Sequence, residues 1–316
     1  MSFMKDDVSR RDFVMGLAKV CLGASVLSLD KNIFAVDAKA KPALPRFGGK
    51  AKRVIYLFMD GGMSHLDTLD PKPGTEVQGP TTPIQTSVPG ILLGEHFVNT
   101  SREMKKIALV RSLTSREGAH ERAKYQLHTS YPPLSSVYHP TLGSWILKYG
   151  GRINQELPGF VAVGNSPFNS GYFDNEFDPF RVGDSQRALV NVVPPKDVNE
   201  EKMDRRLKLL QDVNSDFAKK YSGIEPVRDY ANFYDRALVM MRSKDLEAFD
   251  VTQESKTTRE AYGMNQFGQG VLLARRLVEK DVRFVEVSFG GWDTHVDNFE
   301  KLKSQVGIVD KAVSSL

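Results

Sequence analysis

Residues 54–59 read Val-Ile-Tyr-Leu-Phe-Met, six apolar residues in a row with no polar residue between them. A strand with one solvated face alternates apolar and polar residues, whereas a strand buried on both faces is apolar throughout. Strands of the second kind belong to parallel sheets that helices cover on both sides. This run therefore predicts an α/β fold and constrains the chain more than any other stretch.

Polar residues follow this predicted strand at once. Asp60 comes first, then the glycines at 61–62, then Ser64, His65 and Asp67. In open α/β sheets, ligands bind just beyond the carboxyl ends of the strands, and glycines let the backbone turn tightly there. Carboxylate and imidazole groups together suit a divalent metal ion such as zinc or manganese. In the alternative interpretation, Asp60 caps a turn and Ser64 begins a helix.

A second strand is expected at 282–289, and it also ends at two glycines followed by acid and imidazole groups. Asp293 and His295 are two residues apart, so in an extended segment their side chains point to the same side. Two such groups can bind one ion. The alternative is that Asp297 or Asn298 caps the next helix and that His295 packs under Trp292.

The third segment, 111–130, follows an expected strand at 107–113 and enters an expected helix at 117–127. A helix start offers free backbone N–H groups and a positive dipole to an anion. Three basic side chains accompany it: Arg116, Arg122 and Lys124. The alternative is an ordinary basic surface helix, which explains Arg122 more easily than His120.

The remaining pattern alternates strands with helices. A short strand is expected at 159–163, a loop at 166–184, and helices at 140–147, 200–255, 266–280 and 298–316. Strands separated by helices indicate a three-layer α/β/α domain with a mostly parallel central sheet. The charged helical stretch 200–255 is predicted to be an insertion or a cover.

The N-terminus carries a predicted targeting signal. Ser9-Arg10-Arg11-Asp12-Phe13-Val14 matches the twin-arginine pattern, and an apolar stretch and several alanines follow. The apolar stretch is too short and too weakly hydrophobic for a stable membrane span. We therefore expect a signal peptide and linker at 1–40, a domain at 41–316, and periplasmic or other export by the twin-arginine machinery. The alternative is a cytoplasmic amphipathic helix.

Composition excludes several classes of protein. The formal net charge is +4, and the lysines and arginines are scattered rather than gathered in a stripe, which argues against nucleic-acid binding. The single cysteine, Cys21, lies inside the predicted signal. A mature chain without cysteine has no disulfide, no thiolate nucleophile and no cysteine-ligated zinc.

The last predicted helix, 298–316, has no following strand. A helix that feeds a parallel sheet normally leads to another strand. We therefore expect the domain to be incomplete at its C-terminus, with further ligands downstream.

Five stretches together resemble the DUF1501 proteins, sulfatase-like relatives within the alkaline phosphatase superfamily. They are 60–73, 120–131, 138–144, 157–161 and 291–298. The resemblance implies an alkaline phosphatase-like fold with a two-metal site at the carboxyl edge of the sheet. It matches Asp60, Asp293 and His295 to metal ligands, and two such ions would stabilise phosphoryl or sulfuryl transfer. His65 is a further candidate ligand, and the ion is zinc, manganese, calcium or magnesium.

The chain departs from the sulfatase pattern at the nucleophile. His120 stands at the position of the modified cysteine or serine, and Lys124 stands where an arginine is expected. With no cysteine available, formylglycine chemistry is excluded. His120 is then a metal ligand, a base or a phospho-acceptor, and Ser64 and Ser115 are weaker candidate nucleophiles.

The function expected from these features is that of an exported, metal-dependent hydrolase of anionic phosphate or sulfate esters. The alternative is an exported binding protein that keeps the fold without catalysis.

Overall fold

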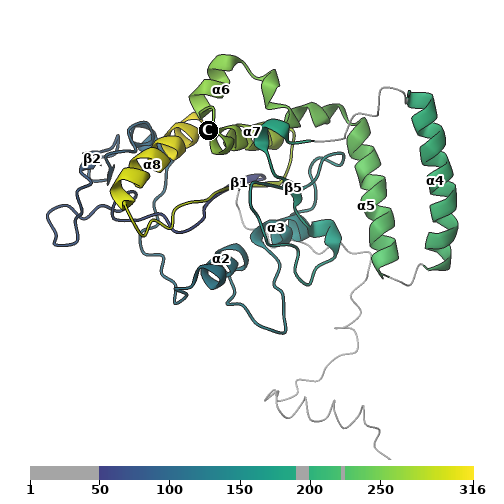
Figure 1. Cartoon of the computed structure of the whole chain (residues 1–316), viewed down its shortest axis with the longest axis horizontal. Coiled ribbons are helices and arrows are strands. Elements are labelled where there is room, and N and C mark those ends of the chain that lie inside the picture. The colour runs from purple at the N-terminus through teal and green to yellow at the C-terminus, as the bar shows by residue number, and fades with distance from the viewer. Residues whose placement is uncertain (1–49, 190–198, 222–224) are drawn as a thin grey trace, which may run out of the picture. The chain divides into compact units, whose positions relative to one another are not determined.

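The computed structural model of the protein describes residues 50–189, 199–221 and 225–316. Its centre is a four-stranded sheet in the order β1-β6-β4-β5, in which every neighbouring pair is parallel. The strands are β1 (Val54–Met59), β4 (Phe160–Val163), β5 (Phe180–Val182) and β6 (Phe284–Phe289). A second, antiparallel sheet pairs β2 (Pro83–Gln85) with β3 (Leu92–Gly94). Figure 1 shows how these elements are arranged.

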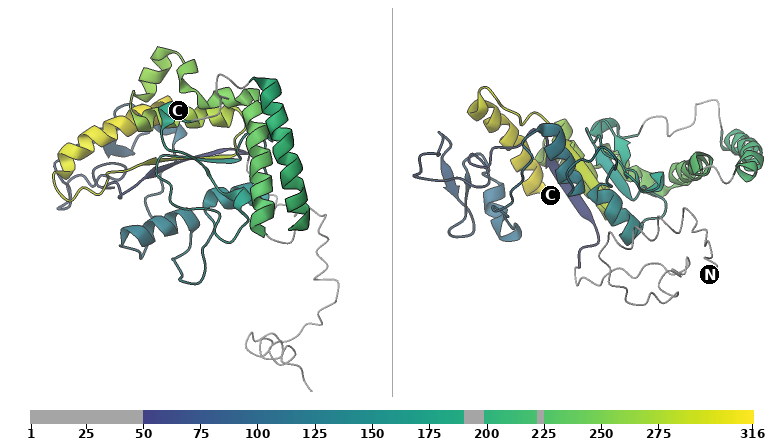
Figure 2. Two further views of the ribbon diagram at one scale, coloured as in Figure 1. Left: turned by 45° about the vertical axis from the view of Figure 1, so that its right-hand side comes forward. Right: turned by 90° about the horizontal axis from the view of Figure 1, so that it is seen from below.

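Helices cover both faces of the main sheet, as Figure 2 shows. Val161, Val285 and Val287 form one core with α7 (Gln266–Glu279) and α8 (Asn298–Ser315). On the opposite face, Phe160 and Phe284 pack with Leu147 of α3 (Leu142–Gly150). The α2 helix (His120–Thr129) lies on that second face too, where the ring of His128 contacts that of Phe58. The predicted three-layer α/β architecture with a parallel sheet is therefore confirmed.

Side-chain caps begin two of the covering helices. The Asn265 side chain accepts a hydrogen bond from Gly268 N at 2.9 Å at the start of α7. The Thr141 hydroxyl accepts one from Ser144 N at the start of α3. Such caps satisfy backbone donors that the first turn of a helix leaves free. The sequence thus sets where these helices begin, and their apolar faces set how they pack.

The register of β1 against β6 positions the strand ends. The Val54 N–H donates to Arg283 O and the Asp60 N–H donates to Phe289 O, both at 2.9 Å. The two strands therefore end at the same level, and the residues that follow them lie side by side at the carboxyl edge of the sheet.

Helices α4 (Glu200–Lys220) and α5 (Glu225–Arg242) occupy much of the segment predicted to be helical at 200–255. Arg242 of α5 pairs with Asp204 of α4. The other described helices are α6 (Lys256–Tyr262) and the short 3-10 helices Thr100–Lys106, Asn175–Phe177, Ser185–Arg187, Lys244–Phe249 and Val251–Gln253.

Two expectations are wrong. Residues 107–113 do not form a strand, and the side chains of Val110 and Leu113 are largely exposed. Arg111 instead donates to the carbonyl oxygens of Leu69 and Leu92. The predicted loop at 166–184 contains β5, which pairs with β4.

The predicted signal segment, 1–40, lies outside the described residues. Among the helices that are described, none combines the length and the hydropathy that a membrane span requires.

Candidate functional site

The turn after β1 and the loop after β6 are in direct contact. Gly61 has φ +112°, and a Cβ atom at this residue would lie 2.5 Å from the backbone nitrogen of Asp293. The Trp292 N–H donates to Asp60 O at 3.2 Å. Glycine is therefore required at 61 both for its backbone conformation and for this close approach. The approach brings Asp60 and Asp293 to one place.

The α2 helix lies across this place and directs two basic side chains to it. Lys124 Nζ lies 2.9 Å from Asp60 Oδ1, and His120 Nε2 lies 3.1 Å from Asp293 Oδ2. His120 and Lys124 are four residues apart, so they share one face of the helix. His295 completes the group, with Nδ1 at 3.0 Å from Asp293 Oδ1. We call Asp60, His120, Lys124, Asp293 and His295 the strand-end cluster.

Burial falls across the strand-end cluster from Asp60 outward. The Asp60 Oδ1 atom is inaccessible to solvent and has no hydrogen-bond partner among the described residues other than the Lys124 ammonium. The contact with Asp60 raises the pKa of Lys124, so this lysine keeps its positive charge. His120 and Asp293 are about half exposed. The cluster therefore offers a fixed cation at its base and accessible imidazoles at its rim.

The two alternative interpretations of the second segment are wrong. The His295 side chain is 78% exposed, whereas Trp292 is buried, so the imidazole is not packed under the indole. Asp297 has φ +55° and its side chain makes no cap hydrogen bond to α8. Asp293 and His295 do face one another, as their spacing predicts.

Ser64 lies in a different network. Its hydroxyl donates to Asp67 Oδ2 at 2.6 Å, and the Thr81 hydroxyl donates to Asp67 Oδ1 at 2.8 Å. The Asn298 amide of α8 also reaches Asp67, at 3.4 Å. Asp67 is buried, so these bonds join the turn after β1 to α8. The hydroxyl of Ser64 thus supports the turn and is not directed at the strand-end cluster.

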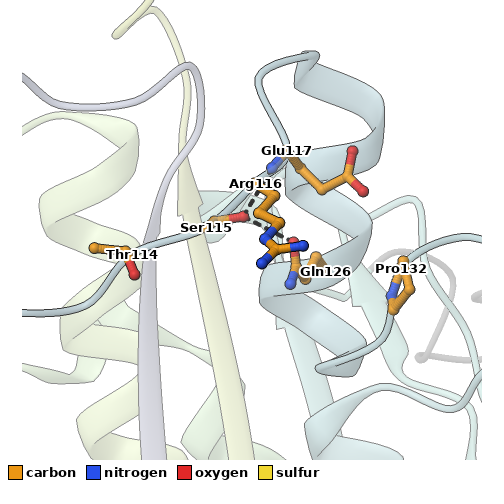
Figure 3. Close-up of a pocket in the computed structure, with 6 residues that line it drawn as sticks. All are labelled: Thr114, Ser115, Arg116, Glu117, Gln126 and Pro132. Atoms are coloured by element: carbon orange, nitrogen blue, oxygen red, sulfur yellow. Dashed lines mark hydrogen bonds between the residues drawn. The ribbon is translucent and has the colours of Figure 1, made fainter.

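His65 is exposed, and in the described part of the chain its imidazole forms no ion pair with a carboxylate. Ser115 lies beside the start of α2, in a cavity of about 500 Å³ that Figure 3 shows. Its hydroxyl donates to Gln126 Oε1 at 2.8 Å. The structure therefore does not bring His65 or Ser115 into the strand-end cluster.

Five of the six residues that line the cavity beside α2 carry polar or charged side chains. Its lining residues are Thr114, Ser115, Arg116, Glu117, Gln126 and Pro132. The Glu117 carboxylate accepts two hydrogen bonds from the Arg122 guanidinium, and these bonds lower the pKa of its carboxyl group. The exposed Arg122 is thereby explained as an ordinary surface ion pair, as the alternative interpretation of the third segment expected.

Sequence reasoning missed a buried acid–base pair behind the strand-end cluster. His128 Nε2 lies 3.2 Å from Glu286 Oε1, and both side chains are almost completely buried. The signal was present, because Glu286 interrupts an apolar strand and a buried carboxylate needs a partner. His128 also lies four residues beyond Lys124 on the same face of α2.

The strand-end cluster supplies oxygen and nitrogen donors, although no three His, Cys, Asp or Glu side chains among the described residues are arranged to hold a metal ion. No curated protein and no solved structure matches the chain. A family model described as "Protein of unknown function (DUF1501)" matches residues 51–316. This match covers most of the chain, which therefore belongs to the DUF1501 family.

Proposed function

We propose that the protein is an exported, metal-dependent hydrolase of phosphate or sulfate esters with an alkaline phosphatase-like fold. The observation that carries the proposal is the meeting of Asp60 and Asp293 beneath His120 and Lys124 at the carboxyl edge of a parallel sheet. This edge is where α/β folds bind ligands. The lysine supplies positive charge for an anionic ester, and the histidines supply imidazole nitrogens that can donate or accept a proton.

The donors of the strand-end cluster fit a divalent metal ion in kind. Among the described residues, the buried Asp60 Oδ1 atom has no partner besides the Lys124 ammonium, so an anionic oxygen is present at the base of the cluster. Asp60, Asp293 and His295 would hold the ion. Two carboxylates with an imidazole favour zinc or manganese over calcium and magnesium, which prefer oxygen alone. When bound, the metal would polarise the ester and activate water.

The chain's own groups have separate roles in this proposal. The ammonium of Lys124 binds an ester oxygen and neutralises its charge. Asp293 contacts Nε2 of His120 and Nδ1 of His295, so the other nitrogen of each ring is left to face substrate or metal. A carboxylate that orients an imidazole in this way also stabilises its protonated form. His120 is then the residue that takes or delivers the proton.

Metal content and ester hydrolysis of the full-length protein test the proposal. Elemental analysis should find stoichiometric metal, and a screen of phosphate and sulfate esters should find turnover. Asp60→Asn and Asp293→Asn should each reduce both the metal content and the turnover. Asp297→Asn is the matched control, because Asp297 is exposed and makes no cap bond, and asparagine also tolerates its positive φ.

Two results would count against this proposal in different ways. A wild-type protein without stoichiometric metal would refute metal-dependent hydrolysis. Full activity in Asp60→Asn and Asp293→Asn would show that the site lies elsewhere. Export is a separate part of the proposal, and detection of the mature protein outside the cytoplasm tests it.

A non-catalytic exported binding protein is the second candidate. The observation that favours it is His120, which stands where the resemblance expects a nucleophile but pairs with Asp293. This candidate predicts that phosphate or sulfate esters bind to the strand-end cluster without turnover. Calorimetry with a hydrolysis assay on the same sample separates the two candidates.

A further inference from the structure

We propose that the buried His128–Glu286 pair is a positioning device for the strand-end cluster. The pair holds α2 against the sheet at the one level where Lys124 reaches Asp60 and His120 reaches Asp293. The inference deepens the proposed function, on which its consequence for activity rests. The placement of α2 can be tested without any activity.

Three acid–base contacts lie along one face of α2. They join His120 to Asp293, Lys124 to Asp60, and His128 to Glu286. The three basic residues are spaced four apart, which places them in one row on the helix. Each acid comes from the sheet or from the end of one of its strands. We call these three the outer, middle and inner contacts.

Exposure decreases steadily along the row. The side chains are 49% and 47% exposed in the outer contact, 23% and 20% in the middle one, and 3% and 2% in the inner one. Solvent screens exposed ion pairs and makes them weak, whereas a buried pair is hard to break because each partner would be left without compensation. The inner contact is therefore the one able to hold the helix in place.

The hydrogen bonds of His128 bind it both to its own helix and to the sheet. Nδ1 lies 2.8 Å from the carbonyl oxygen of Lys124, so this nitrogen donates. Nε2 then shares a proton with Glu286, either as a donor to the carboxylate or as an acceptor from the carboxylic acid. In both cases one proton lies between Nε2 and the carboxyl group, and the pair is neutral overall. The lysine backbone and the sheet are thus connected through a single imidazole.

The surroundings of the inner contact are mostly aromatic. Rings of Tyr56, Phe58 and Phe168 pack around His128, with centroids 4.5 to 5.6 Å from the imidazole. Ser288 donates weakly to Glu286, at 3.4 Å. Apart from Glu286, the titratable groups near the imidazole are the Tyr56 phenol and, along α2, Lys124. Lys124 is the other cation of this set, and it already pairs with Asp60, so His128 is the base that remains for Glu286.

Chemical labelling of Lys124 tests the positioning directly. In the wild-type protein its ammonium is held by Asp60, so acetylation measured by mass spectrometry should be slow. The internal control is Lys280, which pairs with Asp245 and Glu247 in a different part of the protein. Thermal unfolding of each variant shows whether it remains folded.

Three variants separate positioning from simple core packing. Glu286→Gln keeps the contact, since its amide donates to a neutral His128, and Lys124 labelling should stay within about twofold of wild type. Glu286→Leu leaves the imidazole without its partner. His128→Leu combined with Glu286→Leu restores an apolar core without a buried charge, so this double variant remains informative if the single variant unfolds.

In the double variant we expect Lys124 labelling to rise about tenfold while Lys280 labelling stays unchanged. Ester turnover should fall in the double variant and be retained in Glu286→Gln. A folded double variant with wild-type labelling of Lys124 would overturn the positioning role. A wild type without ester turnover would instead count against the proposed function and would leave the labelling result standing.

Discussion

The ammonium nitrogen of Lys124 lies 2.9 Å from the buried Oδ1 atom of Asp60, so an ion pair joins the middle of α2 to the end of β1. Both side chains are mostly withdrawn from solvent. Such a pair contributes little net stability when intact, but removing one partner leaves the other charge buried alone.

Lys124→Met should therefore destabilise the protein by about 1–3 kcal/mol, because the Asp60 carboxylate loses the one partner that it has in the described part of the chain. Asp60→Asn in the same chain should recover much of this loss, since a neutral amide needs no cation. Urea unfolding of the wild type, both single variants and the double variant measures the coupling. Strictly additive effects would show that the two side chains do not interact in solution.

Gly61→Ala should be more damaging than Gly62→Ala. Both glycines have positive φ, so alanine costs about 1–2 kcal/mol of backbone strain at either residue. At 61 the new Cβ would also lie 2.5 Å from the Asp293 nitrogen, whereas at 62 no atom lies within 4 Å. Thermal unfolding should thus show an additional loss only for Gly61→Ala. Equal losses would mean that the loop after β6 moves aside freely.

Stability should depend on Tyr56 at high pH. Burial, with the nearby Glu286 as the second cause, raises the pKa of Tyr56 from 10.0 to about 12. The native state then keeps a proton that the unfolded state releases, so this contribution is fully present below about pH 10 and is lost as the pH rises towards about 12.

Between about pH 9 and pH 11, the wild type should lose about 1.4 kcal/mol more unfolding free energy than Tyr56→Phe, which has no phenol to titrate. Denaturant unfolding at both pH values provides the comparison. An identical pH dependence of the two proteins would contradict the raised pKa.

Asp310→Ala should destabilise the contact between α8 and the 3-10 helix at Thr100–Lys106. The buried Asp310 carboxylate accepts from the backbone nitrogens of Asn99 and Thr100, at 2.9 and 2.7 Å. Its loss leaves these donors unsatisfied and should cost roughly 2–3 kcal/mol. Asp235→Ala, at an exposed residue of α5, should change stability by less than about 0.5 kcal/mol. Similar losses in both variants would contradict the capping role.

The sequence was most informative where apolar periodicity and burial agree. The runs that form β1 and β4 are continuous and apolar, and β6 is apolar except at Glu286 and Ser288, because helices cover both faces of the sheet. Asp60 and Asp293 were predictable because residues after parallel strands must meet at one edge. Each of these signals lies within a short stretch of sequence, although the two residues whose contact they predict are far apart in the chain.

The features that the sequence predicted wrongly or did not predict depend on partners that are distant in the chain. Residues 107–113 have the composition of a strand, but no strand among the described residues pairs with them. β5 is three residues long and exists through its pairing with β4. His128 and Glu286 are 158 residues apart, and although Glu286 stands out in an apolar strand, only the structure reveals its partner. A periodic pattern carries no information about such partnerships.

Because the three basic residues of α2 are evenly spaced, they could pair with the acids of the sheet in more than one alignment. Four residues of a helix rise about 6 Å along its axis. If α2 moved along its axis by that distance, Lys124 would face Asp293 and His128 would face Asp60. Both of these acids would still have a basic partner. Within this row of contacts, the penalty would fall on Glu286, which would be left in the interior without a base. The inner contact therefore decides between the two alignments, and it lies at the end of the row farthest from where a substrate would bind.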